Sequence, residues 1–296
     1  MYQLSRGDKV FNGFNMILVG IFTLVILYPL LFVVFASLSD PRHIFDQVLL
    51  LWPRGFTLEG YKRVFANGDI WMGFKNAVIY TALGTAVNVI MTTLAAYPLS
   101  RRDFRGRNVI TMLFTFTMFF SGGLIPTYIV NEGLGIVNTM WVMIIPGAVS
   151  VYNMIIMRTY FQQNIPVELE ESAFIDGATD IQLLLKVVLP LSTPIIAVMM
   201  MFYGVGRWNG YFDAMIYLSD RNLFPLQLIL REILVQNQMG DAANQAMMSV
   251  NQSEVSALKQ SIKYAVVVVS SVPVLLFYPV VSKYFEKGIM IGAIKG

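Results

Sequence analysis

The chain has 296 residues and a net charge of +3, with 56% hydrophobic and only 13% charged residues. Soluble domains carry about 25% charged residues, so this composition excludes an ordinary soluble domain, and the small charge favours a membrane protein with basic loops over a nucleic-acid-binding protein. Cysteine is absent and His43 is the only histidine, which excludes a disulfide framework and nearly excludes histidine-based metal sites and catalytic bases.

Six apolar stretches are long enough to cross a bilayer, which takes about 20 residues of helix. The mean hydropathy of the whole chain is +0.62, and none of the six stretches contains Asp, Glu, Lys, Arg or His. We therefore predict a single membrane domain over residues 1–296 with six transmembrane helices. The expected segments are about 14–37, 77–99, 109–130, 140–157, 187–206 and 265–281.

The first segment follows Arg6 and Lys9 and precedes Ala36 and Ser37, an arrangement that a secretion signal shares. Its apolar core is far longer than the roughly 7–15 residues of a signal peptide. We interpret it as a retained membrane anchor.

Basic residues near the ends of the segments predict the orientation. The connection after the second segment is short and strongly basic, and Arg158 and Lys186 lie in the connection after the fourth. Placing these residues in the cytosol puts both termini there, with a cytosolic loop at about 159–186 and outer loops at about 38–76 and 207–264. The outer loops hold basic residues too, but long loops weigh less in this rule. The short connection contains Arg101, Arg102, Arg105 and Arg107.

Residues 166–190, here called the acidic hairpin, predict two helices joined by a sharp turn. Pro166 suits the first turn of a helix, and the acidic residues after it complement the positive end of the helix dipole. Gly177 is a natural left-handed stop, and Thr179 and Gln182 have the spacing of a capping box that starts a second helix. A rigid, protruding knob results. The acids in the first helix are Glu168, Glu170 and Glu171.

Two interpretations of the acidic hairpin remain open on local grounds. Small residues and carboxylates would let a protein partner dock closely, whereas an amphipathic connector would lie on the lipid headgroups. The acidic polar face has the wrong sign for anionic lipid, which favours docking.

The acidic hairpin resembles the EAA loop of ABC-importer permeases, with the pattern Glu-Ala-Ala-x3-Gly-x9-Ile-x-Leu-Pro. Ser172 and Val187 depart from it, each with a residue of similar size. The likeness covers essentially the whole chain and is to carbohydrate permeases similar to the second, six-helix maltose permease. In general look, the sequence is closest to the branch that serves pectin-type and alginate-type oligosaccharides. The residues that carry the likeness are Glu171, Ala173, Gly177, Leu189, Pro190, Pro194, Trp208, Asn209 and the tail from Tyr284 to Gly296.

The resemblance implies an all-α membrane protein with six transmembrane helices of the type I ABC-importer permease fold. It implies a permease subunit of an ATP-driven importer that moves a sugar or oligosaccharide, including uronate-containing plant fragments, across the bacterial cytoplasmic membrane by alternating access. The chain would then have no catalytic residue, cofactor or metal, because a partner ATPase uses ATP and Mg. The implied partners are a second and different permease, a dimeric ABC ATPase, an extracytoplasmic solute-binding lipoprotein, lipid and the oligosaccharide, but no nucleic acid.

The resemblance also assigns contacts to residues. The acidic hairpin would sit in a cleft of the ATPase, and the tail would reach between the ATPase subunits. The amide-rich stretch 236–252 would contact the binding protein, although its composition equally suits a flexible polar loop. The expected hairpin contacts are Glu170, Glu171, Ser172, Ala173, Asp176, Gly177 and Ala178; those of the tail are Lys287, Lys295 and Gly296; and those with the binding protein are Gln238, Asn244 and Gln245.

Amide and aromatic side chains are the candidates for the substrate path, because amides bond sugar hydroxyls and aromatic faces cover sugar rings. Trp208 and Tyr211 could equally anchor the membrane interface, and Asn88 and Asn153 could bond between helices. Arg207 could meet an anionic uronate, and in relatives the substrate contacts can fall mainly on the other permease. The candidates are Asn88, Tyr128, Asn153, Tyr203, Arg207, Trp208, Asn209 and Tyr211.

Two absences from the sequence bear on the energy source. There is no Gly-x4-Gly-Lys-Ser/Thr phosphate loop, and the six segments hold none of the ionisable groups that ion-coupled carriers usually keep in the membrane. The alternative is an ion-driven secondary carrier with a carbonyl-built Na⁺ site. A membrane enzyme is disfavoured because the hairpin acids lack a neighbouring base or metal-ligand spacing.

Overall fold

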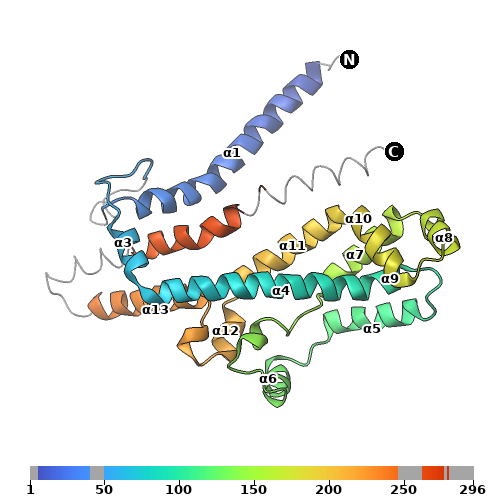
Figure 1. The fold of residues 1–296 in the computed structure, drawn as a ribbon. Coiled ribbons are helices and arrows are strands. Elements are labelled where there is room, and N and C mark those ends of the chain that lie inside the picture. The colour runs from blue at the N-terminus through green and yellow to red at the C-terminus, as the bar shows by residue number, and fades with distance from the viewer. Residues whose placement is uncertain (1–5, 41–49, 246–261, 277–278, 280–296) are drawn as a thin grey trace. The chain divides into compact units, whose positions relative to one another are not determined.

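The computed structural model describes residues 6–40, 50–245, 262–276 and 279. Every regular element in this described part is helical (Figure 1), so the predicted all-α class is confirmed. The chain divides into two compact units, Met1–Gly68 with Glu232–Ser271 and Asp69–Arg231 with Val272–Gly296.

The first unit is built on helix α1 (Arg6–Ser37), which is long and apolar enough to cross a membrane. Its most apolar window has a mean hydropathy of 2.8 and is 0% buried within the structure. A small cluster packs at its end, where Leu50 and Ala36 are buried and the ring of Phe32 meets that of Tyr264 edge-on at 5.8 Å. The helix α3 (Glu59–Ala66) also belongs to this unit.

The second unit is organised around α4 (Gly68–Ser100), an uninterrupted 33-residue helix (Figure 1). The acidic hairpin packs against the C-terminal end of α4. The other elements are α5 (Arg107–Phe119), α6 (Leu124–Gly133), η1 (Met140–Met143), α7 (Val151–Asn164), α8 (Val167–Ile175), α9 (Asp180–Leu183), the π-helix η2 (Leu184–Val188), α10 (Leu189–Leu191), α11 (Thr193–Trp208), α12 (Phe212–Tyr217), η3 (Arg221–Leu223) and α13 (Leu226–Gln245).

One buried cluster joins the C-terminal half of α4 to α7, to the acidic hairpin and to α11. Because these side chains are buried against one another, these four parts form one packed block. The cluster contains Ala96, Tyr97, Leu99, Met154, Met157, Phe161, Ile165, Leu183, Leu184, Val188, Ile195, Met199 and Tyr203.

The expected segment 109–130 is two helices rather than one. Helices α5 and α6 meet at an angle of 114°, and residues 120–123 between them are not helical. Gly122 and Gly123 lie at the bend, and Gly123 has a φ of +86° that other residues rarely adopt. The apolar composition of this segment therefore gave no sign of the non-helical residues within it.

The expected segment 140–157 is also interrupted. The short 3₁₀-helix η1 ends at Met143, residues 144–150 are not helical, and α7 begins only at Val151. Pro146 and Gly147 explain the interruption, because proline lacks an N–H and Gly147 has a φ of +67°. We call residues 144–150 the break.

The fifth expected segment, 187–206, bends by 82° between the helical run Asp180–Leu191 and α11. Ser192 sits at this bend, with a proline two residues to either side. By contrast, α1 and α4 begin earlier than the expected 14–37 and 77–99, and the last described helix covers Ile262–Leu276 of the expected 265–281. In the described part of the chain, two helices can cross a membrane unbroken, or four if each bent pair is one span.

The second outer loop of the prediction is partly helical. Within the expected outer loop 207–264, the helix α13 covers Leu226–Gln245, and Leu226, Leu228 and Ile229 at its start are buried. Gly73 on α4 lets α13 come close, since a Cβ there would lie 3.1 Å from the Leu226 backbone.

Candidate functional site

The acidic hairpin has the local structure that its sequence predicts. Pro166 is the N-cap of α8, and the left-handed Gly177 (φ +80°) ends the helix. The Gly177 N–H donates to the Phe174 carbonyl at 3.0 Å and the Ala178 N–H to that of Ala173 at 2.9 Å, which is the Schellman pattern of a helix end.

A capping box starts the second helix of the hairpin. The Gln182 N–H donates to Thr179 Oγ1 at 3.3 Å, and the Thr179 N–H donates back to Gln182 Oε1 at 3.0 Å. Both turns of the backbone are therefore fixed by hydrogen bonds, which makes the hairpin a defined shape rather than a loose loop.

The tip of the hairpin combines acidic and apolar exposed side chains. Glu171, Ser172 and Asp176 are exposed, and Ile175 is 86% and Ile181 69% exposed. Ala173 and Ala178 are half-buried. A surface with large exposed isoleucines beside carboxylates suits contact with a protein better than contact with water.

Glu170 differs from Glu171, because it turns inward to the end of α4. Its Oε2 lies 3.0 Å from Nη1 of Arg101 as an ion pair, and the two side chains are only 19% and 9% exposed. Arg101 also donates to the Asp103 carboxylate at 3.1 Å through both Nε and Nη2 and lies 5.1 Å over the ring of Phe174. Arg101 therefore fastens α8 to the α4–α5 connection.

The electrostatics of this contact follow from burial. Burial raises the pKa of Glu170 above its ordinary value, although the charge of Arg101 acts in the opposite direction. The hydrogen bond from Arg101 lowers the pKa of Asp103. Glu170 is thus a partly desolvated acid whose ionised form the charge of Arg101 favours.

Other basic and amide side chains cap the C-terminus of α4. Arg158 Nε donates to the Leu99 carbonyl at 2.8 Å, Gln162 Nε2 to that of Ser100 at 3.4 Å, and Arg107 Nη1 to that of Arg101 at 3.0 Å. Cations at this end complement the helix dipole. The basic connection that predicted orientation therefore also has a structural role.

A second group of polar side chains, here called the polar cluster, lies between α4 and α11. Asn88 and Thr92 are one turn apart on α4, and both are fully buried. Thr92 Oγ1 and the Tyr203 hydroxyl form a 2.6 Å hydrogen bond, and the same hydroxyl accepts from the Ser150 N–H at 3.1 Å. Asn88 Nδ2 donates to the carbonyls of Gly147 and Ala148, both at 2.8 Å.

Arg207 on α11 completes the polar cluster. Its Nε donates to Asn88 Oδ1 at 3.0 Å, and its Nη1 donates to the Met143 carbonyl at 2.7 Å. Its Nη2 donates to the carbonyls of Ile144 at 3.2 Å and Pro146 at 3.0 Å. Asn88, Tyr203 and Arg207 are thus three predicted path residues that the structure brings together, and each bonds the chain itself.

The remaining predicted path residues have other contacts. Asn153 is buried in the first turn of α7, where its N–H donates to the Ser150 hydroxyl at 3.4 Å. Trp208 is buried and meets Phe74 edge-on at 5.8 Å. The ring of Tyr128 stacks on Tyr217 at 5.8 Å.

Asn209 and Tyr211 follow α11 and have exposed side chains. Asn209 Nδ2 donates to the carbonyl of Val205 at 3.0 Å. The guanidinium of Arg231 lies 5.1 Å over the ring of Tyr211. An exposed arginine here is a residue that the sequence did not single out.

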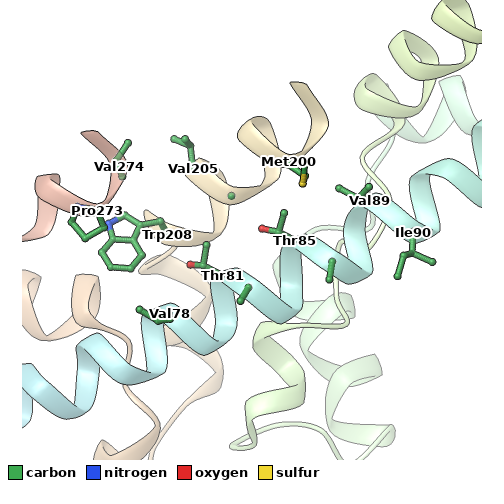
Figure 2. Close-up of a pocket in the computed structure, with 13 residues that line it drawn as sticks. Val78, Thr81, Thr85, Val89, Ile90, Met200, Val205, Trp208, Pro273 and Val274 are labelled. Atoms are coloured by element: carbon green, nitrogen blue, oxygen red, sulfur yellow. The ribbon is translucent and has the colours of Figure 1, made fainter. Parts of the chain in front are cut away.

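An apolar pocket of about 520 Å³ opens between α4, α11 and the segment at Pro273 and Val274 (Figure 2). Thr81 and Thr85 project into it from α4, and their hydroxyl oxygens are buried without a hydrogen-bond partner among the described residues. Trp208 closes one end.

The remaining predicted contacts are less fully described. The structure describes Gln238, Asn244 and Gln245 as part of the helix α13 but does not describe their side chains. Lys287, Lys295 and Gly296 lie outside the described residues. Within the described part, no three His, Cys, Asp or Glu side chains gather as a metal site would need.

Sequence reasoning missed Gly84, Thr92 and Ser150 in the polar cluster. Gly84, Asn88 and Thr92 recur every four residues in an apolar helix, and this spacing of small and polar residues is typical of a close helix–helix contact. Arg207 lies one residue beyond the expected segment 187–206 but inside α11.

Known proteins share this architecture and sequence. A family model described as the binding-protein-dependent transport system inner membrane component matches residues 70–291. The protein LplC of Bacillus subtilis strain 168 is 37% identical over 99% of this chain and 97% of its own length. The polygalacturonan/rhamnogalacturonan transport system permease protein YtcP of the same strain is 40% identical over 96% of this chain and 98% of its own.

A solved structure is similar in fold as well as in sequence. It is a chain of a bacterial ABC transporter involved in the import of the acidic polysaccharide alginate. The TM-score is 0.84 and the identity 33%, and the match covers 96% of this chain and 100% of that one.

Proposed function

Because the chain belongs to the binding-protein-dependent transport system inner membrane components, it is a membrane-integral permease subunit of an ABC sugar importer whose ATPase is a separate subunit, and we propose that it imports acidic oligosaccharides. Such a permease works together with another permease, an ATPase and a solute-binding protein. The all-helical type I importer fold that the sequence resemblance predicted is confirmed by the similarity to the alginate importer.

The acidic character of the substrate rests on two relatives. One is named for polygalacturonan and rhamnogalacturonan, and the other imports alginate. Both kinds of polymer contain uronate sugars, each with a carboxylate. The exposed guanidinium of Arg231 beside Tyr211 supplies a cation suited to such a carboxylate, on the loop that we place outside the membrane.

The proposed assembly is specific. A second, different permease chain pairs with this one, a dimeric ATPase binds ATP and Mg, and a lipoprotein delivers the oligosaccharide from outside the cytoplasmic membrane. Both termini lie in the cytosol. The tail with Lys287, Lys295 and Gly296 contacts the ATPase, and α13 with Gln238, Asn244 and Gln245 contacts the lipoprotein.

The acidic hairpin is the proposed docking site for the ATPase, and its rigid, exposed tip is the observation that carries this proposal. Glu171, Asp176 and Ile175 offer charge and apolar area to a partner. The packed cluster behind the tip reaches α4, α7 and α11, so a force applied at the hairpin acts on several helices together. We expect Glu171→Lys or Gly177→Asp to abolish uptake while the protein still inserts.

The substrate proposal is tested with the complete importer in proteoliposomes. Uptake of trigalacturonate and of a neutral trisaccharide of the same length is measured with ATP inside. ATP-driven uptake of the acidic sugar, insensitive to ionophores, is the expected result. Uptake that needs an ion gradient and no ATP would instead support the secondary carrier, and equal uptake of both sugars would refute acidic selectivity.

A matched pair of variants tests Arg231. Arg231→Gln should raise the KM for trigalacturonate and leave that for any neutral sugar unchanged. Arg221→Gln is the control, because Arg221 is an exposed arginine of the same loop that pairs with Asp69 at 2.9 Å. An equal rise in KM for both variants would exclude a specific role for Arg231.

A further inference from the structure

The break at residues 144–150 poses a physical problem that the polar cluster solves. Non-helical backbone at membrane depth is tolerated only where its polar groups are satisfied by protein or water. The carbonyls of Met143, Ile144, Pro146, Gly147 and Ala148 all receive hydrogen bonds from just two side chains, Asn88 and Arg207.

The guanidinium of Arg207 occupies a cage of oxygen atoms. Among the described residues, it donates to three main-chain carbonyls and to the Asn88 side-chain oxygen, at 2.7–3.2 Å. All four acceptors are neutral, so the cage resembles a site for a cation that the protein fills with its own side chain. A planar guanidinium can reach several acceptors at fixed angles, which an ammonium cannot.

The cage is shaped for this particular side chain. A Cβ added at Gly84 would lie 3.1 Å from Arg207 Nε, 3.2 Å from Cδ and 3.4 Å from Cγ. The absence of a side chain at position 84 therefore leaves the space in which the Arg207 side chain packs against α4. Asn88, one turn further along α4, then receives the Nε hydrogen bond.

The cage connects α4 to the segments on both sides of the acidic hairpin. The break leads directly into α7 and from there into the acidic hairpin, and α11 leaves the hairpin at its other end. Arg207 and Asn88 tie both of these flanking segments to α4. Resting on the hairpin's role in the proposed function, we propose that Arg207 is a positioning residue that makes α4, the break and α11 move as one unit when the ATPase acts on the hairpin.

Contiguity alone does not establish energetic coupling between sites, so the test measures coupling directly. The complete importer, with each variant of this chain, is reconstituted in proteoliposomes, and the number of sugar molecules imported per ATP hydrolysed is determined. Trigalacturonate and the neutral trisaccharide of the same length are both offered, and the one that the unaltered importer carries is used for all variants. A failure of the proposed substrate class therefore leaves this test intact.

Arg207→Ala should lower the ratio of sugar to ATP at least about tenfold, which corresponds to about 1.4 kcal/mol. Guanidinium ion added at tens of millimolar should restore part of it by entering the vacated cage, whereas urea, which is neutral and of similar shape, should not. Arg207→Lys should stay impaired, because one ammonium cannot bond all four acceptors. A loss caused by general misfolding would not be rescued by guanidinium, because it would not depend on the vacated cage.

Two glycine variants control for the shape of the cage. Gly84→Ala should lower the ratio because it displaces the arginine stem. Gly206→Ala, next to Arg207 on the same helix, meets nothing within 4 Å and should retain the ratio of the unaltered importer. If Arg207→Ala fails to assemble, the two glycine variants and Asn88→Asp test the proposal instead. Asn88→Asp keeps the oxygen that accepts from Arg207 but loses the N–H groups that donate to Gly147 and Ala148.

The proposal is overturned if Arg207→Ala imports as many sugars per ATP as the unaltered chain, or if its defect is insensitive to guanidinium while Gly84→Ala matches Gly206→Ala. Loss of ATP-driven uptake in the unaltered importer would instead count against the proposed function.

Discussion

Replacing Arg101 with alanine removes the side chain that fastens α8 to the end of α4. Glu170 would remain 19% exposed without its cation, and breaking a fully buried ion pair in this way costs about 3–5 kcal/mol. Partial exposure reduces that figure, the exposed Asp103 adds little, and the contact with Phe174 adds about 0.5–1 kcal/mol. We expect a cost of about 2–3 kcal/mol to the anchoring of α8.

Hydrogen exchange of the α8 amides in the assembled importer measures this cost, because exchange reports local opening. A cost of about 2–3 kcal/mol corresponds to roughly 30-fold to 150-fold faster exchange. Arg105→Ala, which removes an exposed arginine from the same connection, is the control and should leave exchange unchanged.

The double variant Arg101→Ala with Glu170→Gln separates charge from packing. Removing the stranded carboxylate charge should recover most of the lost protection, because an uncharged amide is easier to bury. Arg101 does not anchor α8 in this way if Arg101→Ala exchanges like Arg105→Ala, or if the double variant is less protected than the single one.

Three further results are expected. Burial raises the pKa of Glu170 and the charge of Arg101 opposes this rise, so the raised pKa should persist in Arg101→Ala. In that variant the stability from the neutral carboxyl is present below the ordinary pKa and is lost as pH rises through the higher folded-state value. After correction for intrinsic exchange, α8 in Arg101→Ala should therefore become better protected on acidification, and a flat profile would contradict this. Gly73→Ala would place a Cβ 2.5 Å from Ile229 Cδ1 and 3.1 Å from the Leu226 backbone, so thermal unfolding should show a loss of about 1–3 kcal/mol, against no comparable loss for Gly68→Ala, which meets nothing within 4 Å. Gly177→Ala has free space around its Cβ but a φ of +80°, so strain alone should cost about 1–2 kcal/mol of hairpin stability, and an unchanged unfolding temperature would exclude that strain.

The acidic hairpin was predictable because its signals are local. Pro166, Gly177 and the Thr179–Gln182 box each act on backbone within a few residues, so spacing alone fixes the turn. The inward direction of Glu170 was not predictable in this way, since it depends on Arg101, which lies far away in the sequence.

The broken segments show the limit of hydropathy. Residues 109–130 and 140–157 are uncharged and mostly apolar, yet both contain non-helical backbone at glycine or proline. Composition indicates which segments lie in lipid or in a core. Whether the backbone is helical within such a segment also depends on hydrogen-bond donors from side chains that are distant in the sequence. Arg207 is such a donor, and the same composition rule placed it just outside its helix.

Helix α4 carries the Asn88 contact, and the Arg101 anchor directly follows its last residue, about 20 Å away at 1.5 Å per residue. Inserting a single residue between them would rotate one contact by about 100° relative to the other. Substitutions on the exposed face of α4 leave both contacts in place, whereas insertions and deletions do not. Related permeases should therefore differ by substitutions in this helix far more often than by insertions or deletions.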